Sequence, residues 1–391
     1  MSSNQVEIRV GGKRYGGWKS VLITSSIEQV ARAFALEVTE NFPGNTDFTA
    51  LQTGELVQVY IGEDLVCTGY ITSTPIRYDG KTVSVQVQGK SRTVDLVDCC
   101  PPSAAYAPPA ASANLWSEVK GRSGKAQAAP AAAAKPQTSW KNLPAGRIIE
   151  ELAKPYGITL TISAESNEVK THTVNPGETV FESIKRLITK DNLVLTDDEA
   201  GNLVLVEPGG AGQATDALEL GGNILKASAR FDASARFSHY VAHYVALGQH
   251  AGTDEDFGRT AAEDKGVAVD PEVKRFRLKV LKDSGQASLK TAGDRARFEA
   301  NFQAARFRAV TYTVQGWRQS DGSLWRPNTT VLVRDQKLFP SGGTMLVVQV
   351  KLQLSSAGMT AELGLMPPAG YRRDAAKSDT KQSSSTWASV K

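Results

Sequence analysis

The sequence has few of the residues that most often carry chemistry. It contains three cysteines and four histidines among 391 residues. The cysteines are Cys67, Cys99 and Cys100, an odd number, and a disulfide between two adjacent cysteines is geometrically disfavoured. This pattern excludes a small secreted domain stapled by disulfides and predicts folding in a reducing compartment.

Long apolar runs are also missing. No window approaches the roughly 18 apolar residues of a membrane-spanning helix. The N-terminal stretch MSSNQVEIRVGGKRYGGW lacks the basic start and apolar run of a secretory signal. The net charge of +4 is small for this length and does not indicate the strongly basic face of a nucleic-acid-binding protein. We therefore expect a protein made in a cytoplasm, with no membrane partner and no specific nucleic-acid binding.

The common catalytic motifs are absent as well. The chain has no G-x-S-x-G, no H-E-x-x-H, no P-loop and no G-x-G-x-x-G after a strand. His239 and His243 have a spacing that could bind metal on a helix, but HYVAHYVALG alternates like a strand. A strand separates them by about 13 Å on one face, too far for one ion. Carboxylate pairs such as Asp197 and Asp198 are interpreted as solvated turns. The sequence predicts no enzyme, no metal and no cofactor.

The chain does contain strand-like alternation of apolar and polar residues near both ends. Stretches such as VEIRVGG, SVLITSSI and LVQVYIG alternate with period two, and glycine and aspartate separate them, as in small barrels or sandwiches. A similar pattern returns in AVTYTVQGW, TTVLVRD and TMLVVQVKLQLSS. Between these regions, Thr179 and Glu182 form a capping-box pattern before a helix. The predicted fold class is a β-rich multidomain α+β chain with two small β-barrels.

Composition sets the predicted domain boundaries. A segment rich in alanine and proline follows the first β region and cannot bury much apolar surface. The predicted parts are a first β-barrel at 1–98, a Pro/Ala-rich insert at 99–140, an α+β module at 141–207 and 251–305, a second β-barrel at 208–250 and 306–366, and a flexible tail at 367–391.

The segment HTVNPGETVFESIKRL, residues 172–187, resembles the opening of a LysM module. LysM modules attach to peptidoglycan, so this resemblance implies a peptidoglycan-binding or cell-wall-degrading tail protein as an alternative function. The candidate glycan-binding residues would be Asn175, Gly177, Glu178 and Thr179. The other interpretation is a purely structural strand, turn and capped helix.

The stretch VQGWRQSDGSLWRPN, residues 314–328, carries two of the six tryptophans on either side of an Asp321-Gly322 turn signal. Strict alternation places Tyr312 and Val314 on one face of the preceding strand and Trp317 on the other. The two rings could pack across a hairpin. Alternatively, they could anchor a protein interface, where tryptophan is enriched.

This stretch resembles a segment of the baseplate hub proteins of Mu-like contractile-tailed phages, also called 43-kDa tail proteins. GKSRTVDLVDCC at 89–100 and VGGKRYGGWKSVLITSSIEQVARAFALEVTENFPG at 10–44 resemble two further segments of that family. DDEAGNLVLVEPG, LGGNILKASARFDASARFSHYVAHYVALGQ and RARFEANF continue the likeness, so it covers most of the chain in collinear order. The insert at 101–138 and the tail after 367 depart from it.

The resemblance implies a structural role without catalysis. Family members form a homotrimer in which each subunit contributes two β-barrels to a ring. That ring joins the six-fold tail tube to the three-fold central spike, and DNA can pass its channel. The implied location is the virion tail baseplate, assembled in the bacterial host cytoplasm. The family-motif positions, taken as candidate interface residues, are Trp18, Arg92, Asp95, Asp98, Trp317, Arg318, Asp321, Gly322, Trp325 and Asn328. For Arg92, Asp95 and Asp98 an ordinary solvated role stays open.

Overall fold

The structure is a computed structural model. It describes residues 4–40, 51–78, 83–102, 137–163, 166, 168–191, 194–243, 265–282, 289–340 and 342–371. The chain divides into two compact units. Unit 1 comprises Met1–Ser228 and Val310–Leu365, and unit 2 comprises Ala229–Ala309 and Met366–Lys391. Most of the predicted insert (103–136) and of the predicted tail (372–391) lies outside the described residues.

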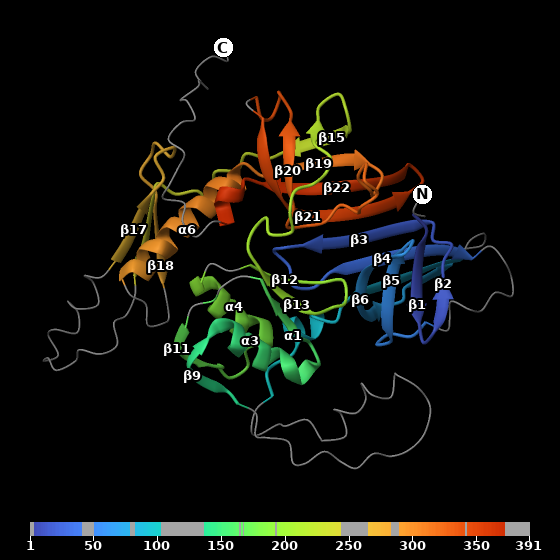
Figure 1. Cartoon of the computed structure of the whole chain (residues 1–391), viewed down its shortest axis with the longest axis horizontal. Helices are drawn as coiled ribbons and strands as arrows, with labels where there is room; N and C mark the ends of the chain where they lie inside the picture. The colour runs from blue at the N-terminus through green and yellow to red at the C-terminus, as the bar shows by residue number, and fades with distance from the viewer. Residues whose placement is uncertain are drawn as a thin grey trace, which may run out of the picture. The chain divides into compact units, whose positions relative to one another are not determined.

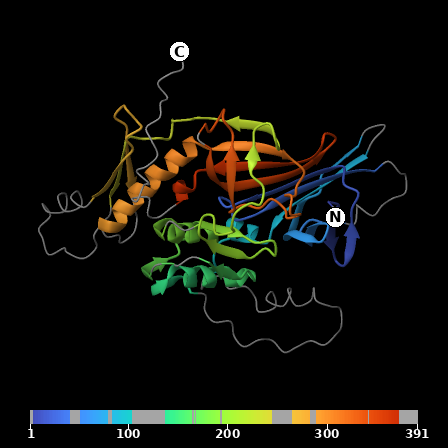
Figure 2. The ribbon, with the colours of Figure 1, turned by 45° about the horizontal axis from the view of Figure 1, so that its top comes forward.

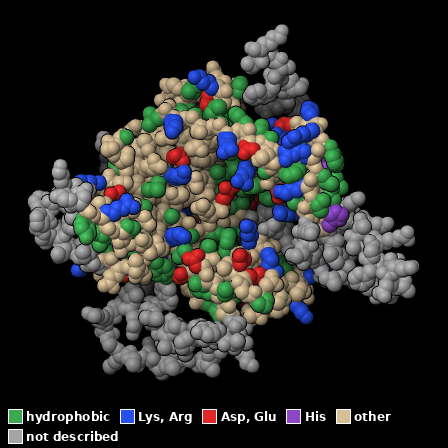
Figure 3. Space-filling view, turned by 180° about the vertical axis from the view of Figure 1, so that it is seen from behind, with side chains coloured by type: hydrophobic (Ala, Val, Ile, Leu, Met, Phe, Trp, Pro, Cys, Tyr) green, Lys and Arg blue, Asp and Glu red, His purple; other side chains and the backbone are tan. Residues whose placement is uncertain are grey.

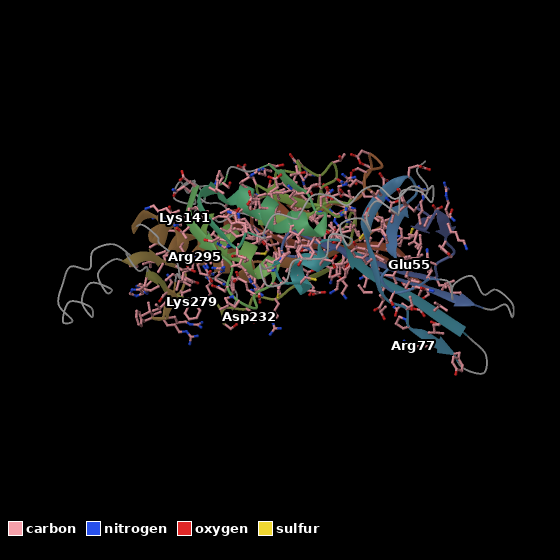
Figure 4. All side chains as sticks on the ribbon, turned by 90° about the horizontal axis from the view of Figure 1, so that it is seen from below. Glu55, Arg77, Lys141, Asp232, Lys279 and Arg295 are labelled. Atoms are coloured by element: carbon pink, nitrogen blue, oxygen red, sulfur yellow. The ribbon has the colours of Figure 1, made fainter. Side chains whose placement is uncertain are left out.

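The strands predicted for the N-terminal region are present. They are β1 (Val6–Val10), β3 (Ser20–Ser26), β4 (Ala33–Glu40), β5 (Leu56–Ile61), β6 (Asp64–Ser73) and β8 (Val83–Ser91), joined by the short β2 (Lys13–Tyr15) and β7 (Ile76–Tyr78). In β1 and β5 every second residue is buried, so the period-two pattern marks the face that enters the core. All three residues of β7 are exposed, and Figure 4 labels Arg77 at its centre.

The C-terminal β region is also present. It consists of β14 (Leu218–Glu219), β15 (Ile224–Ala229), β19 (Val310–Gln315), β20 (Thr330–Arg334), β21 (Gly343–Ser355) and β22 (Gly358–Met366). β19 and β22 pair antiparallel, with Tyr312 opposite Leu363. Both residues are fully buried, which places the core of this region on that face.

The sequence predicted two separate β-barrels, but the two β regions are joined in the structure. The described strands of both regions form a single sheet of 14 strands, whose main path runs β15-β19-β22-β21-β3-β4-β8-β6-β5-β1-β2 without closing. β21 has 13 residues, and β20 pairs only with its beginning. The rest of that edge would leave backbone N–H and C=O groups unpaired, and β3 occupies it. Figure 1 shows the two strands, from opposite ends of the chain, side by side.

A mixed α+β module lies between the two β regions in the sequence of unit 1. It contains β9 (Ser139–Pro144), α3 (Ala145–Ala153), η3 (Lys154–Tyr156), β10 (Leu160–Ile162), β11 (Glu168–Thr173), α4 (Val180–Asp191), β12 (Val194–Asp197) and β13 (Leu203–Val206). The short α1 (Val94–Asp98) contributes Leu96 to the module's apolar core, where it joins Ile148, Ile184 and Leu203. The predicted capping box of α4 is confirmed: the backbone N–H of Thr179 donates to Glu182 Oε2 at 2.8 Å, and that of Glu182 donates to Thr179 Oγ1 at 3.2 Å.

Unit 2 is a small sheet covered on one face by a helix. The sheet has the order β17 (Lys265–Val269), β16 (His239–His243) and β18 (Leu278–Lys282), and the helix is α6 (Leu289–Phe307). Figure 2 shows this helix, in orange, lying along the strands. Small residues allow the close approach, since a Cβ at Gly266 would overlap the backbone of α6 at Gly293. No helix in the described part of the chain is both long and apolar enough to cross a membrane.

Unit 2 also departs from the predicted boundaries. Its strands β17 and β18 fall within 251–305, and its helix α6 begins in that range and ends at Phe307. The sequence grouped this range with 141–207, which instead lies in unit 1. The predicted tail begins with a folded turn, η4 (Pro368–Tyr371). Tyr371 is buried there and meets Phe302 of α6 edge-on, with ring centroids 5.5 Å apart. An aromatic contact therefore orders the first residues after β22.

We expect Gly69→Ala to lower the free energy of unfolding by about 1–3 kcal/mol, because extra volume in a closely packed site forces backbone shifts. A Cβ at Gly69 on β6 would overlap the carbonyl oxygen of Lys90 on β8. Urea unfolding of the full chain measures the effect. Gly16→Ala is the control, since its Cβ would meet Val6 O at an ordinary 3.6 Å. Equal unfolding midpoints for the two variants would contradict the expected overlap.

Candidate functional site

The predicted tryptophan hairpin is present in unit 1. Gly322, at φ 86°, donates its backbone N–H to Gln319 O at 2.9 Å, and Gln319 N donates to Ser323 O at 2.8 Å. The backbone N–H of Trp325 donates to Trp317 O at 3.1 Å, which joins the two arms. The turn at Asp321-Gly322 is therefore confirmed, because glycine accepts the positive φ that this turn requires.

The predicted face of Trp317 is wrong. Val310, Tyr312 and Val314 are buried on one face of β19, and strict alternation would have sent Trp317 to the opposite face. Instead its side chain is fully buried. The reason is Gly316, whose φ of 77° turns the chain at the end of the strand and breaks the period of two.

Both tryptophan rings lie inside unit 1. Trp317 Nε1 donates to Gln353 O at 3.0 Å and to Thr360 O at 3.1 Å, carbonyl groups of β21 and β22. Trp325 is buried too, and its Nε1 has no hydrogen-bond partner among the described residues. The rings therefore brace the hairpin against the sheet from within.

Arg318 ties the hairpin to the N-terminal β region. Its Nη1 lies 2.6 Å from Asp64 Oδ2 and donates to Gly322 O at 2.8 Å. Nη2 donates to Ile61 O at 3.0 Å, and Nε donates to Asn4 Oδ1 at 2.9 Å. The planar guanidinium thus reaches the β5–β6 turn and the hairpin turn at once, a geometry that lysine does not reproduce.

Asp321 organises the exposed tip of the same hairpin. Its Oδ1 accepts from the backbone N–H and the hydroxyl of Ser323, at 2.8 and 2.7 Å. Its Oδ2 accepts from Thr215 Oγ1 at 2.7 Å. The hydrogen bonds from Ser323 and Thr215 lower the pKa of Asp321 to about 2, because they favour the charged carboxylate.

Asn328 closes the motif by holding a glycine-rich turn. It adopts a φ of 65°, which asparagine tolerates better than most residues, and it is buried. Its Oδ1 accepts from Gly209 N at 2.8 Å, while its Nδ2 donates to Glu207 O at 3.0 Å. The amide therefore positions the chain that leaves the α+β module.

The other family-motif positions lie apart from the hairpin. Trp18 is in the segment that connects β2 to β3, and it is buried. Arg92 Nη2 donates to Gly157 O at 2.6 Å, so this side chain links β8 to the end of η3. On α1, burial raises the pKa of Asp95, and the nearby charge of Asp98 raises it further. Asp98 is exposed.

The candidate glycan-binding positions form a self-contained turn before α4. Glu178 Oε1 accepts from Asn175 N at 2.8 Å and from Arg186 Nη2 at 2.6 Å, and Oε2 accepts from Asn175 Nδ2 at 3.0 Å. Burial opposes ionisation of Glu178, but the hydrogen bonds from Asn175 and Arg186 lower its pKa overall. Gly177 has a φ of 81°, and Thr179 caps the helix. All four positions therefore serve local structure.

Sequence reasoning missed a buried ion pair. Arg32, in the turn before β4, donates from Nε to Asp197 Oδ1 at 3.1 Å and from its backbone N–H to Asp197 Oδ2 at 3.0 Å. Its Nη1 lies 3.0 Å from Glu199 Oε1. Asp197 is buried at the end of β12, so its interpretation as a solvated turn residue is wrong. Burial also raises the pKa of the neighbouring Cys67 thiol to about 12. The apolar residues Val194 and Leu195, which precede Asp197 in β12, were the available signal in the sequence.

The two histidines lie on one face of β16, as predicted, with Val241 between them. In the part of the chain that the structure describes, no group of three histidine, cysteine, aspartate or glutamate side chains could hold a metal ion. The polar groups described above instead join strands and turns to one another.

The chain is similar to known tail proteins along most of its length. It is 30% identical over 374 residues to baseplate hub protein gp44 of Escherichia phage Mu, covering 94% of this chain and 89% of that protein. The chain belongs to the family of Mu-like baseplate hub proteins. Its residues match three domain families of such hubs. The matches are 5–91 to the Mu phage baseplate assembly protein GpP-like N-terminal domain, 129–207 to the second domain of baseplate hub protein gp44-like, and 288–374 to the fourth domain of Mu phage baseplate assembly protein GpP.

Solved structures agree with this assignment. The 43 kDa tail protein of prophage MuSo2 from Shewanella oneidensis is 26% identical, with a TM-score of 0.74 over 94% of this chain and 99% of that one. The E. coli c3393 protein shares the fold, with 9% identity and a TM-score of 0.50 over 92% of this chain and 76% of that one. It is a type VI secretion system component described as similar to the T4 bacteriophage tail proteins gp27 and gp5. As a baseplate hub protein, the chain is a structural component of a phage tail.

We expect Trp317→Ala to destabilise the hub protein by about 3–5 kcal/mol, the usual cost of truncating a buried aromatic ring. The variant also leaves the carbonyl groups of Gln353 and Thr360 without their donor. Urea unfolding measures the change, with Tyr78→Ala as the control at an exposed ring. A folded Trp317→Ala chain of unchanged stability would show that the ring does not brace the hairpin.

The hydrogen bonds of Asp321 predict a defined pH dependence. Its pKa falls from an ordinary value of about 4 to about 2 on folding, so the charged carboxylate stabilises the fold above pH about 4. That contribution is lost as the pH falls from about 4 through about 2. The melting temperature of the unsubstituted chain should therefore exceed that of Asp321→Asn at neutral pH, and the difference should disappear by pH about 2. A difference that stays constant over this range would contradict the assignment.

Proposed function

We propose that this baseplate hub protein acts as a homotrimer that adapts the six-fold tail tube to the three-fold central spike. Each subunit has an N-terminal β region (β1–β8) and a C-terminal β region (β14, β15 and β19–β22), and these act as two similar β repeats of one ring. Three subunits then present six similar repeats toward the tube, while the whole assembly keeps three-fold symmetry toward the spike. A closed ring of identical head-to-tail contacts satisfies both requirements.

The observation that carries the proposal is the open sheet of unit 1. Its main strand path ends at β2 on one side and at β15 on the other, so the two ends differ. β2 is mostly exposed, and so is β15. Two different edges, each without a further partner among the described strands, favour a heterologous contact, which closes into a ring rather than a face-to-face dimer.

The family-motif residues support this arrangement in two ways. Buried members, such as Trp18, Trp317 and Asn328, hold the β regions in place. The exposed carboxylates Asp98 and Asp321 are the positions that we propose for contacts with neighbouring subunits. The partners are a central spike protein and tail tube or baseplate proteins, and assembly takes place in the bacterial host cytoplasm before the hub becomes part of the virion.

We also infer that the hub protein has no catalytic activity. Its most chemically suggestive side chains, Arg32 with Asp197 and Arg318 with Asp64, are engaged with one another and join separate parts of the fold. The positions that favoured cell-wall binding, including Asn175 and Glu178, are likewise engaged in their own turn.

The solution mass of the purified full chain tests the trimer. Light scattering on a sizing column, over a concentration series, should give about three times the chain mass of 41.9 kDa. Asp98→Lys, which reverses an exposed charge at a proposed contact, should weaken association without lowering the melting temperature. A strict monomer, or a dimer, at the highest concentration would overturn the proposed ring.

A further inference from the structure

The sheet of unit 2 has two unlike faces. Tyr240, Ala242 and Ala268 point toward α6, where they pack against Ala292 and Ala296. The alternate residues point away from the helix. α6 covers only one side of the sheet, so the outward side chains have no helix or strand of unit 2 over them among the described residues.

The outward side chains form a largely apolar surface across the three strands. The strand register sets Val267, Val241 and Val280 in one row across the three strands. The next row holds Val269 and Leu278 on either side of His239. The outward apolar face, as we call it, consists of Val241, Val267, Val269, Phe276, Leu278 and Val280. A contiguous apolar patch of this kind marks a contact site more often than single exposed residues do.

The exposed fractions show how little of this face is covered. Its members outside the central strand are between 47% and 76% exposed, and Phe276 is the most exposed of them. The Phe276 ring lies 5.2 Å from the His239 ring, centroid to centroid, so the phenylalanine stands at the border of the apolar rows. A large ring in this position is typical of an interface anchor.

Positive charge borders the same face. Lys274 and Arg275 precede Phe276, are exposed, and have no carboxylate within ion-pair distance among the described residues. The nearby acids are already paired: Arg236 lies 2.6 Å from Asp270 Oδ2 and 2.6 Å from Glu272 Oε2. Arg308 also pairs with Glu272, at 2.7 Å. Asp270 and Glu272 are therefore paired with arginines inside the unit, and neither forms an ion pair with Lys274 or Arg275. Figure 3 shows apolar, histidine and basic side chains together on the part formed by unit 2.

We propose that the outward apolar face of unit 2 docks another protein of the tail particle, one whose contact surface is apolar and carries carboxylates opposite Lys274 and Arg275. Charge complementarity selects this occupant. A second copy of the same face would bring apolar rows but no free carboxylates. Nucleic acid would match the cations, but bases need aromatic rings to stack on, and the valines and leucine that make up most of the face offer none. The inference rests on the baseplate role and does not depend on the proposed trimer.

The test places Val267→Asp with Val280→Asp in the genome that encodes the chain. Both substitutions lie at exposed positions on the side away from α6, so the purified variant should keep its melting temperature and its solution mass. Its incorporation into tails, measured by quantitative immunoblot of purified particles, should fall about tenfold or more, as expected for a lost interface anchor. Ile76→Asp, at a similarly exposed apolar residue of unit 1, is the matched control and should assemble normally.

A second variant tests the charge. Lys274→Glu with Arg275→Glu should reduce incorporation into tails and leave the solution mass unchanged. Normal incorporation of the valine variant would overturn the proposal. A change in its solution mass would assign the face to contacts between copies of this chain and would also overturn it. Binding of the unsubstituted chain to anionic vesicles or single-stranded DNA, if the valine variant loses that binding, would likewise overturn the assignment to a protein partner.

Discussion

The pairing of β3 with β21 is the constraint on which the architecture of unit 1 depends. It joins residues near the two ends of the chain, with Ile23 opposite Leu352. The closure entropy of so long a loop grows only slowly with length, so six paired positions and their neighbours can offset it. Ser26 strengthens the junction, because its hydroxyl donates to Val348 O at 3.0 Å. Once this edge is paired, the N-terminal and C-terminal strands become one surface.

Two arginines then hold the tryptophan hairpin and the α+β module against neighbouring turns of unit 1. Arg318 connects the tryptophan hairpin to the β5–β6 turn, and Arg32 connects the turn before β4 to β12 of the α+β module. Removing one partner of a buried ion pair is costly, because the other charge stays behind without compensation. These contacts therefore hold separate parts of unit 1 in fixed positions, which suits a structural component of a phage tail.

Unit 2 follows a different principle. Its small cluster of alanines with Tyr240 lets α6 approach the sheet closely but buries little apolar area. The ion pairs of Arg236 with Asp270 and Glu272 hold the loop between β17 and β18. The unit is thus organised to support a surface rather than a large core, and among the described residues no helix or strand of the unit covers the second face of its sheet.

Local sequence alone determined the strands, the helix ends and the family. The period of two located β1, β3 and β5, and the capping box with Glu182 located the start of α4, because these signals depend only on neighbouring residues. Tertiary structure decided which edges pair, which acid Arg32 meets, and where Trp317 points. Every exposed strand edge offers the same backbone N–H and C=O groups. The alternation of apolar and polar residues therefore does not identify which strand pairs with β21. A single positive φ at Gly316 turns the chain at the end of β19, and the alternation that is correct along the strand does not reveal that turn.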